Sequence, residues 1–230
     1  MNNSDKIRIC ELFDALPSVV LPLFDGVEYP WEVIGKIGEY IESITEKGLV
    51  GYNELFPGVY IGENVNISPL STIIPPVIIG DNTEIRPGAY LRGNIIIGKS
   101  CVIGNSTEIK NSILFDKVAV PHYNYVGDSV IGNFAHLGAG VICSNLKSDK
   151  SLVTVKGNKK YDTGLKKLGA ILGDHAEVGC GCVLNPGTII GKGSSVYPLS
   201  SLRGVIPEGH IVKDGKTVIP KKIKYDGLCI

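Results

Sequence analysis

Residues 78–108 read IIGDNTEIRPGAYLRGNIIIGKSCVIGNSTE, and this stretch decides the fold. Its aliphatic residues return every six positions, at Ile79, Ile85, Leu91, Ile97, Ile103 and then Ile109. A six-residue period is neither the 3.6 of a helix nor the alternation of a simple strand. Glycine follows the aliphatic residue at Gly80, Gly98 and Gly104, where a tight turn needs its backbone freedom. This hexapeptide repeat predicts an all-β fold, a parallel β-helix in which three units close each coil.

The repeat places most of the chain in one β-helix, over residues 58–206, with two interruptions. After Ile109 the spacing shortens, because the next aliphatic residue, Ile113, follows by only four positions. Within residues 144–168 the period disappears, and seven lysines accompany a β-prone run and a Tyr161–Gly164 turn that predict a small hairpin. This inserted loop is either a solvated surface or an anion-binding site. Because breaks in a solenoid occur where something besides packing is required, we expect function near both interruptions.

The two ends of the chain lack the repeat. Residues 1–57 predict a short helical N-terminal segment, whose clearest helix runs from Pro30 to Lys47 before a glycine stop. The apolar face of that helix should be buried against the first coil or a neighbouring subunit. Residues 207–230 combine β-prone residues with an Asp214-Gly215 turn. They predict a capping hairpin and tail, which an open-ended solenoid needs.

Composition and charge argue against several classes of protein. Lys plus Arg and Asp plus Glu both number 23, so the formal net charge is zero, and the sequence pI is near 6.9. This balance favours neither a nucleic-acid partner nor a membrane surface. No apolar N-terminal segment resembles a signal or a membrane span, and the six cysteines form no disulfide framework. We therefore expect a cytoplasmic protein with reduced thiols, in which Cys180 and Cys182 fill repeat positions rather than bind a metal.

One histidine lies where the repeat changes character. His122 stands in the sequence VPHYNYVGD, residues 120–128, just after the shortened spacing. An imidazole titrates near neutral pH and can accept a proton from a nucleophile. Glu108 and Lys110 precede His122 by a little under one coil, so we expect them to stack beside it on neighbouring strands. The carboxylate would then hold the imidazole tautomer, and the lysine would meet an anionic substrate. An ordinary surface ladder is the alternative for this cluster.

Longer motifs resemble one family. The sequences IRPGAYL, EIK, HYNYVGD, IGNFAHLGAG, the Asn145 that follows, and DTGLKKLGAILGD occur in this order across residues 85–174. Residues 86–145 resemble the acetyltransferase domain of the bifunctional glucosamine-1-phosphate acetyltransferase/uridylyltransferases, and residues 145–173 are similar to archaeal sugar-1-phosphate relatives. The resemblance implies a left-handed β-helix and a homotrimer with active sites between subunits. Residues 1–57 leave no room for a nucleotidyltransferase domain, so we expect acyl transfer without nucleotide-sugar synthesis.

The resemblance also implies the parts of a catalytic site. The reaction would be a transfer from acetyl-CoA to the amine of an amino sugar 1-phosphate, such as glucosamine 1-phosphate or galactosamine 1-phosphate. His122 would be the general base that deprotonates the amine, and Glu108 would orient it. Arg86 and Lys110 would bind the sugar phosphate.

Further positions follow from the same resemblance. Tyr125 and Asn145 would complete the sugar pocket. His136 stands where the family has an asparagine, so it would select the acceptor sugar. Cys180 stands where the family usually has a serine, and its backbone would lie near coenzyme A together with the basic loop, including Lys150.

Two other classes of function stay open at this point. A zinc enzyme of the γ-carbonic anhydrase type shares the solenoid, and residues 91–94 resemble its Arg-Gly-Asp turn. That enzyme needs three histidines at one metal, two of them close in sequence, whereas His122, His136, His175 and His210 include no close pair. We therefore predict no metal site. The other alternative is a non-catalytic trimeric scaffold or regulatory subunit.

Overall fold

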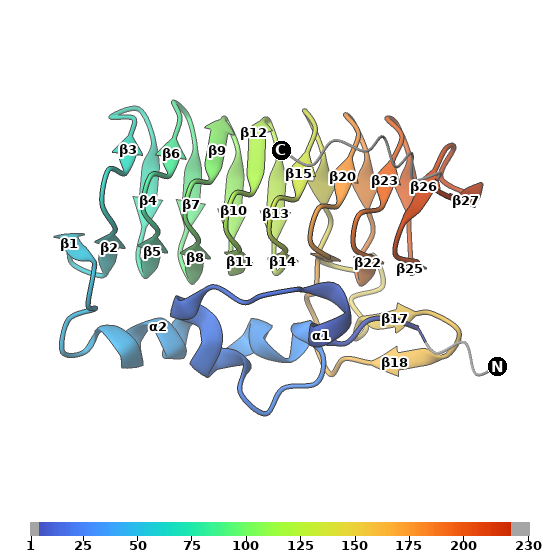
Figure 1. Cartoon of the computed structure of the whole chain (residues 1–230), viewed down its shortest axis with the longest axis horizontal. Helices are drawn as coiled ribbons and strands as arrows, with labels where there is room; N and C mark the ends of the chain where they lie inside the picture. The colour runs from blue at the N-terminus through green and yellow to red at the C-terminus, as the bar shows by residue number, and fades with distance from the viewer. Residues whose placement is uncertain (1–4, 222–230) are drawn as a thin grey trace, which may run out of the picture.

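A computed structural model describes residues 5–221, which form a left-handed parallel β-helix preceded by a helical N-terminal segment (Figure 1). The segment contains α1 (Ile9–Leu12), η1 (Ser18–Phe24), η2 (Pro30–Lys36) and α2 (Ile37–Thr45). The helix predicted from Pro30 is present as a 3-10 helix that continues into an α-helix. Proline favours this start because the first helical position needs no N–H donor.

The strands of the β-helix form three sheets, which we name A, B and C. Sheet A contains β1 (Asn53–Phe56), β2 (Val59–Ile61), β5 (Val77–Ile79), β8 (Ile95–Ile97), β11 (Ser112–Leu114), β14 (Val130–Ile131), β19 (Ala170–Leu172), β22 (Thr188–Ile190) and β25 (Val205–Ile206). Sheet B contains β3 (Asn66–Ile67), β6 (Glu84–Ile85), β9 (Val102–Asn105), β12 (Ala119–His122), β15 (His136–Leu137), β20 (Glu177–Val178), β23 (Ser195–Val196), β26 (His210–Val212) and β27 (Val218–Pro220). Sheet C contains β4 (Thr72–Ile74), β7 (Tyr90–Arg92), β10 (Glu108–Lys110), β13 (Tyr125–Gly127), β16 (Ile142–Cys143), β21 (Val183–Leu184) and β24 (Ser201–Leu202).

From β2 to β26 the coils visit sheets A, B and C in turn, so each of their strands pairs in parallel with the corresponding strand of the next coil. The outermost strands β1 and β27 pair antiparallel with their neighbours. Strand β8 pairs with β5 and β11, for example, and Ile97 lies between Ile79 and Leu114. These inward side chains are fully buried and stack into one continuous aliphatic core. The hexapeptide prediction of a parallel β-helix is therefore confirmed.

The shortened spacing after Ile109 is a one-residue deletion at the corner between sheets C and A. The strand register pairs Ile97 with Leu114, and Leu114 with Ile131. Leu114 therefore takes the core position, and Ile113 points to the outside of sheet A. Placing the repeat on Ile113 was wrong by one residue, because both side chains are fully buried.

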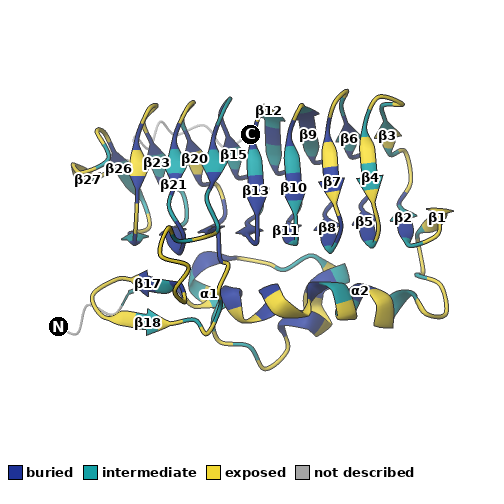
Figure 2. Cartoon of the chain, turned by 180° about the vertical axis from the view of Figure 1, so that it is seen from behind, coloured by how far each residue is buried: buried dark blue, intermediate teal, exposed yellow. Residues whose placement is uncertain are grey.

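A second apolar layer covers the outer face of sheet A. Figures 1 and 2 show the N-terminal helices and the β17–β18 hairpin lying along the strands of this sheet. Six outward residues of sheet A are buried: Ile78, Ile96, Ile113, Val130, Ile171 and Ile189. They pack against apolar residues of the segment that include Phe13, Trp31, Ile34, Ile37 and Ile41. The predicted apolar helix face is thus buried along several coils of the same chain, with η2 against β14 and α2 against β8.

The inserted loop forms the predicted hairpin, but its turn lies elsewhere. Strands β17 (Thr154–Lys156) and β18 (Lys160–Asp162) pair antiparallel, with Val155 opposite Tyr161. The turn therefore falls at residues 157–159 and not at Tyr161–Gly164. Tyr161 meets the ring of Trp31 edge-on at a centroid distance of 6.3 Å. The hairpin consequently extends the N-terminal layer along sheet A.

At the other end, β26 and β27 form an antiparallel hairpin after the last coil. This hairpin lies within the predicted cap at residues 207–230, whose last nine residues, 222–230, lie outside the described part. Figure 2 shows that strands β4 and β7 of sheet C are exposed at their outward positions. The N-terminal layer thus leaves sheet C open.

Candidate functional site

Two shortened corners between sheets C and A place polar side chains close together. A full-length corner contains Gly93 and Asn94, both with positive φ. The shortened corners instead each turn on one residue, Asn111 with φ 45° and Asp128 with φ 50°. Asn and Asp tolerate this left-handed conformation better than other residues that carry a Cβ. The deletions in the repeat therefore bring successive corners into contact through polar side chains.

The carboxylate of Asp128 lies at the centre of this arrangement, and its side chain is 5% exposed. It accepts a hydrogen bond from Asn111 Nδ2 at 2.8 Å and another from Asn145 Nδ2. The ammonium group of Lys110 lies 3.5 Å from both carboxylate oxygens. Asn145 Nδ2 also donates to the hydroxyl of Tyr125 at 3.0 Å. Three of the predicted substrate-binding residues, Lys110, Tyr125 and Asn145, therefore meet around one buried acid.

Sequence reasoning missed Asp128 as a member of the site. The signal was present, because an acidic residue directly after Gly127 ends the HYNYVGD motif and marks a shortened corner. Burial raises the pKa of Tyr125, and the nearby carboxylate of Asp128 raises it further, whereas the hydrogen bond from Asn145 lowers it. The Tyr125 hydroxyl is therefore protonated at neutral pH. Since its oxygen accepts from Asn145, its proton can be donated to a ligand.

Glu108 does not stack on His122, so this part of the prediction was wrong. The cross-strand neighbours of Glu108 in sheet C are Tyr90 and Tyr125. The neighbour of His122 in sheet B is Asn105. The reason is the corner that the chain turns between β12 and β13, which puts the two residues on different faces.

Glu108 has another partner within the chain. Its Oε1 lies 2.5 Å from Arg92 Nη1, and this hydrogen bond, followed by the charge of Glu108, raises the pKa of Arg92. The guanidinium also lies 5.7 Å from the centroid of the Tyr90 ring. Sequence reasoning did not select Arg92, although its even spacing from Tyr90 places both side chains on the outer face of sheet C.

His122 ends β12 with an exposed side chain. Its backbone N–H donates to Asn124 Oδ1 at 3.1 Å, and its carbonyl accepts from the backbone N–H of Gly140 at 3.0 Å. Asn124 is buried, and its Nδ2 donates to the carbonyl of Gly138 at 2.7 Å. These bonds fix the backbone around His122. The imidazole ring itself forms no hydrogen bond or ion pair with any of residues 5–221.

The remaining predicted residues lie outside the Asp128 cluster. Arg86 follows β6 in sheet B and forms an ion pair with Glu84 at 3.0 Å. His136 begins β15, and its Nδ1 lies 3.0 Å from Glu177 Oε2 on the next coil. Cys180 and Lys150 are both exposed. Within one chain, the predicted site residues thus divide between sheet B and sheet C and their corners, except for Lys150 in the inserted loop.

The cysteines are all free thiols in the described residues. Cys182 is buried, and its Sγ donates to the carbonyl of Tyr197 at 3.2 Å, as expected for a residue that fills a repeat position. Within residues 5–221, no group of three or more His, Cys, Asp or Glu side chains is placed to hold a metal ion. In the same part of the chain, every helix is too short or too polar to cross a lipid bilayer.

Comparisons with known proteins agree with the motifs. The family described as GMPPB C-terminal domain matches residues 73–161. The bifunctional protein GlmU of Methanococcus maripaludis strain S2 is 35% identical over 203 residues, which cover 86% of this chain and 49% of that protein. The bifunctional sugar-1-phosphate nucleotidylyltransferase/acetyltransferase of Sulfurisphaera tokodaii is 39% identical over 106 residues, 45% of this chain and 26% of that protein. The chain thus spans about half the length, or less, of these relatives.

A solved structure shares the fold. The UDP-N-acetylglucosamine acyltransferase of Francisella novicida superposes with a TM-score of 0.51 at 15% sequence identity. The match covers 74% of this chain and 68% of that one. At this level of identity the likeness establishes the β-helix architecture alone.

Proposed function

We propose that this chain transfers an acetyl group from acetyl-CoA to an amino sugar 1-phosphate. The chain belongs to the hexapeptide-repeat acetyltransferases related to the bifunctional sugar-1-phosphate nucleotidylyltransferase/acetyltransferases. The observation that carries the proposal is the convergence of Lys110, Tyr125 and Asn145 on Asp128. These side chains offer a cation, a hydroxyl donor and a carboxamide on one open face. A phosphorylated sugar needs these three kinds of contact.

The acceptor lies on sheet C in this proposal. Lys110 attracts the phosphate, and Tyr125 and Asn145 hydrogen-bond the sugar hydroxyls. Asp128 has a positioning role, because it holds Lys110 and Asn145 while it is itself shielded from solvent. Such a fixed set of polar groups binds a sugar without first having to be ordered.

The chemical step requires a base next to the amine. In our proposal the imidazole of His122 accepts a proton from the sugar amine as the amine nitrogen forms a bond to the thioester carbonyl carbon. The carbon–sulfur bond then breaks, and coenzyme A leaves as a thiolate that takes up the proton from the imidazolium. Glu108 of a neighbouring subunit is the proposed orienting carboxylate, because within one chain it lies on a different face from His122. Arg86 and His136 lie on the same sheet as His122. They are the proposed second group of acceptor contacts.

Coenzyme A is proposed to lie along the edge that follows His122. The register of β15 and β20 places Cys180 one coil beyond Ala139 on this edge. An added Cβ at Gly138 would lie only 2.8 Å from the backbone nitrogen of Cys180, so the backbones of the two coils approach closely there. Backbone amides at such an edge can bind the pantetheine arm, and Lys150 can meet a phosphate of coenzyme A.

A homotrimer would join the two groups of residues. Sheet A is covered by the N-terminal layer, which leaves sheets B and C for contact between subunits. In our proposal His122 of one subunit faces the Asp128 cluster of another. Three chains of 24.6 kDa give a particle of about 74 kDa by light scattering. A monomer of active enzyme would contradict this arrangement.

The test of the proposed activity is coenzyme A release from acetyl-CoA over a panel of amino sugar 1-phosphates. The panel contains glucosamine 1-phosphate, galactosamine 1-phosphate and the same sugars without phosphate. We expect release with one phosphorylated amine and an N-acetylated product by mass spectrometry. A folded protein that releases coenzyme A with none of them would contradict the proposal and favour the trimeric scaffold.

A further inference from the structure

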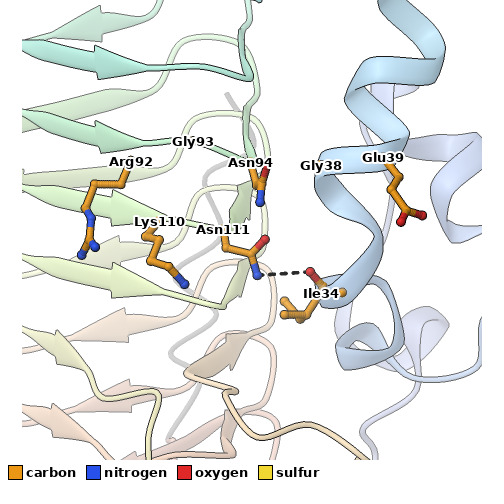
Figure 3. A pocket seen from close by; sticks show the side chains of 9 residues that line it. Ile34, Gly38, Glu39, Arg92, Gly93, Asn94, Lys110 and Asn111 are labelled. Atoms are coloured by element: carbon orange, nitrogen blue, oxygen red, sulfur yellow. Dashed lines mark hydrogen bonds between the residues drawn. The ribbon is translucent and has the colours of Figure 1, made fainter.

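A hollow of about 330 Å³ lies between sheet C and the N-terminal segment. Figure 3 shows Asn94 and Asn111 between the cations Arg92 and Lys110 on one side and the helical segment that carries Ile34, Gly38 and Glu39 on the other. Its volume is within the range of small-molecule sites. The hollow adjoins the Asp128 cluster, because Lys110 belongs to both.

The two cations occupy equivalent positions on adjacent coils. Strands β7 and β10 pair with Tyr90 opposite Glu108 and Leu91 opposite Ile109, so the register continues to Arg92 and Lys110. Adjacent strands lie about 4.8 Å apart, which allows both side chains to contact one phosphate group. Arg92 can do so while it remains paired with Glu108, because a guanidinium has five N–H donors.

Arg86 does not have this relation to Lys110 within the chain. It lies in sheet B and forms an ion pair with Glu84. Arg92 is on the same face and at the same register as Lys110. The geometry therefore favours Arg92 as the second phosphate contact.

The far wall of the hollow belongs to the N-terminal segment. Gly38 lies against Asn94, because an added Cβ would come within 2.6 Å of Asn94 Oδ1. Asn111 Nδ2 donates to the carbonyl of Ile34 at 3.2 Å and fixes the segment to the corner. The same segment contributes Glu39 to this wall.

We propose that this hollow binds the phosphate of the acceptor, with Arg92 and Lys110 as its two cationic contacts and the N-terminal segment as its far wall. The inference rests on the proposed function, and it names the phosphorylated part of the substrate as the part that is recognised. It also gives residues 30–45 a role in substrate binding that a simple linker would lack.

The test is calorimetric titration without acetyl-CoA, with glucosamine 1-phosphate, galactosamine 1-phosphate, the two unphosphorylated sugars and inorganic phosphate as probes. We expect Arg92→Gln to weaken binding of a sugar phosphate about tenfold or more and to leave binding of the bare sugar unchanged. Arg8→Gln is the matched control, because Arg8 also forms one surface ion pair, with Glu28 at 3.0 Å. It should bind like the wild type.

A second variant tests the wall. Gly35 lines the hollow, has no positive φ, and would have nothing within 4 Å of an added Cβ. Gly35→Leu should therefore fold and fill the hollow. Lys36→Leu, at the neighbouring exposed position, should also fold but leave the hollow open. We expect weaker binding of the sugar phosphate only in Gly35→Leu, with thermal unfolding close to that of the wild type.

The outcomes separate this inference from the proposed activity. Binding of a sugar phosphate that depends on Arg92, without acyl transfer, supports the hollow and contradicts the activity. Acyl transfer in which Arg92→Gln and Gly35→Leu leave the KM for the sugar phosphate unchanged supports the activity and overturns phosphate binding in the hollow. A wild-type protein that binds no probe, or binds phosphorylated and bare sugars equally, also overturns it.

Discussion

At the scale of single residues, Asp128 connects the parts of the candidate site. Its carboxylate accepts from Asn111 and Asn145 and lies beside Lys110, with 5% of the side chain exposed. A buried polar group that loses its partner costs more free energy than the bond itself contributes. The chemistry of this one side chain should therefore affect both stability and substrate binding.

Asp128→Asn tests that role with little change in shape, because Asn also tolerates the left-handed backbone at this position. The new carboxamide presents an N–H to side chains that are already donors. We expect the free energy of unfolding in urea to fall by about 1–3 kcal/mol. Asp149→Asn is the control, because Asp149 is an exposed surface partner of Lys147. Equal unfolding midpoints for the two variants would contradict the role given to Asp128.

Two buried thiols predict a dependence of stability on pH. Burial raises the pKa of both Cys101 and Cys143 to about 12 from the ordinary value of 9.0. In the unfolded chain the thiols ionise near pH 9, while in the folded protein they keep their protons. The unfolded state therefore binds fewer protons above pH 9, and stability falls as pH rises.

The measurement compares wild type with Cys101→Ala/Cys143→Ala by urea unfolding between pH 8 and pH 10.5. Each thiol contributes a slope of at most about 1.4 kcal/mol per pH unit. We expect the wild-type curve to fall more steeply than that of the double variant, whatever their difference at pH 8. Parallel curves would show that these thiols do not keep their protons in the folded state.

At the scale of elements, the N-terminal layer and sheet A stabilise each other. Phe115 follows β11 and is fully buried. The centroid of its ring lies 4.8 Å from that of Phe13 and 6.0 Å from that of Phe24. The six-residue repeat marks only the residues that point into the core of the β-helix, so it did not predict this layer. The signal for the layer was a run such as Ile95-Ile96-Ile97, because a strand with three consecutive aliphatic residues is buried on both faces.

Phe115→Ala should remove the packing of this ring on Phe13 and Phe24 and strongly destabilise the protein. We expect the free energy of unfolding to fall by about 3–5 kcal/mol, as for other buried phenylalanines. Phe134→Ala is the matched control, since Phe134 is 45% exposed at a corner of the β-helix. The free energy of unfolding should fall much less in Phe134→Ala in the same denaturation experiment. Similar losses for both variants would mean that the layer adds little to the stability of sheet A.

The elements differ in how well the sequence predicted them. The period predicted the β-helix, and the β-prone run in the inserted loop predicted the hairpin but not the place of its turn. The period misassigned Ile113 and Leu114, because a covered outer face makes both residues apolar. Hydrophobicity alone cannot distinguish the two faces of a strand that is buried on both sides.

At the scale of the whole molecule, the candidate site is divided between two faces of one chain. The motifs that resemble the family contain Lys110, Tyr125 and Asn145, and the structure brings these three residues together around Asp128. The motifs could not place Glu108 relative to His122, because this depends on a corner that the period does not specify. They also could not show Arg92 beside Lys110, since that pairing follows from the strand register.

The central claim is acyl transfer with His122 as the base, and a pair of histidine variants tests it most directly. His122→Asn removes the base, while His175→Asn changes another exposed histidine, which stacks on Phe134 with a centroid distance of 4.6 Å. The measurement is kcat/KM for acetylation of the sugar phosphate identified by the acceptor panel. The account predicts a fall of about 10²- to 10⁴-fold in His122→Asn and a near-normal value in His175→Asn. A His122→Asn enzyme that acetylates at the wild-type rate would contradict it.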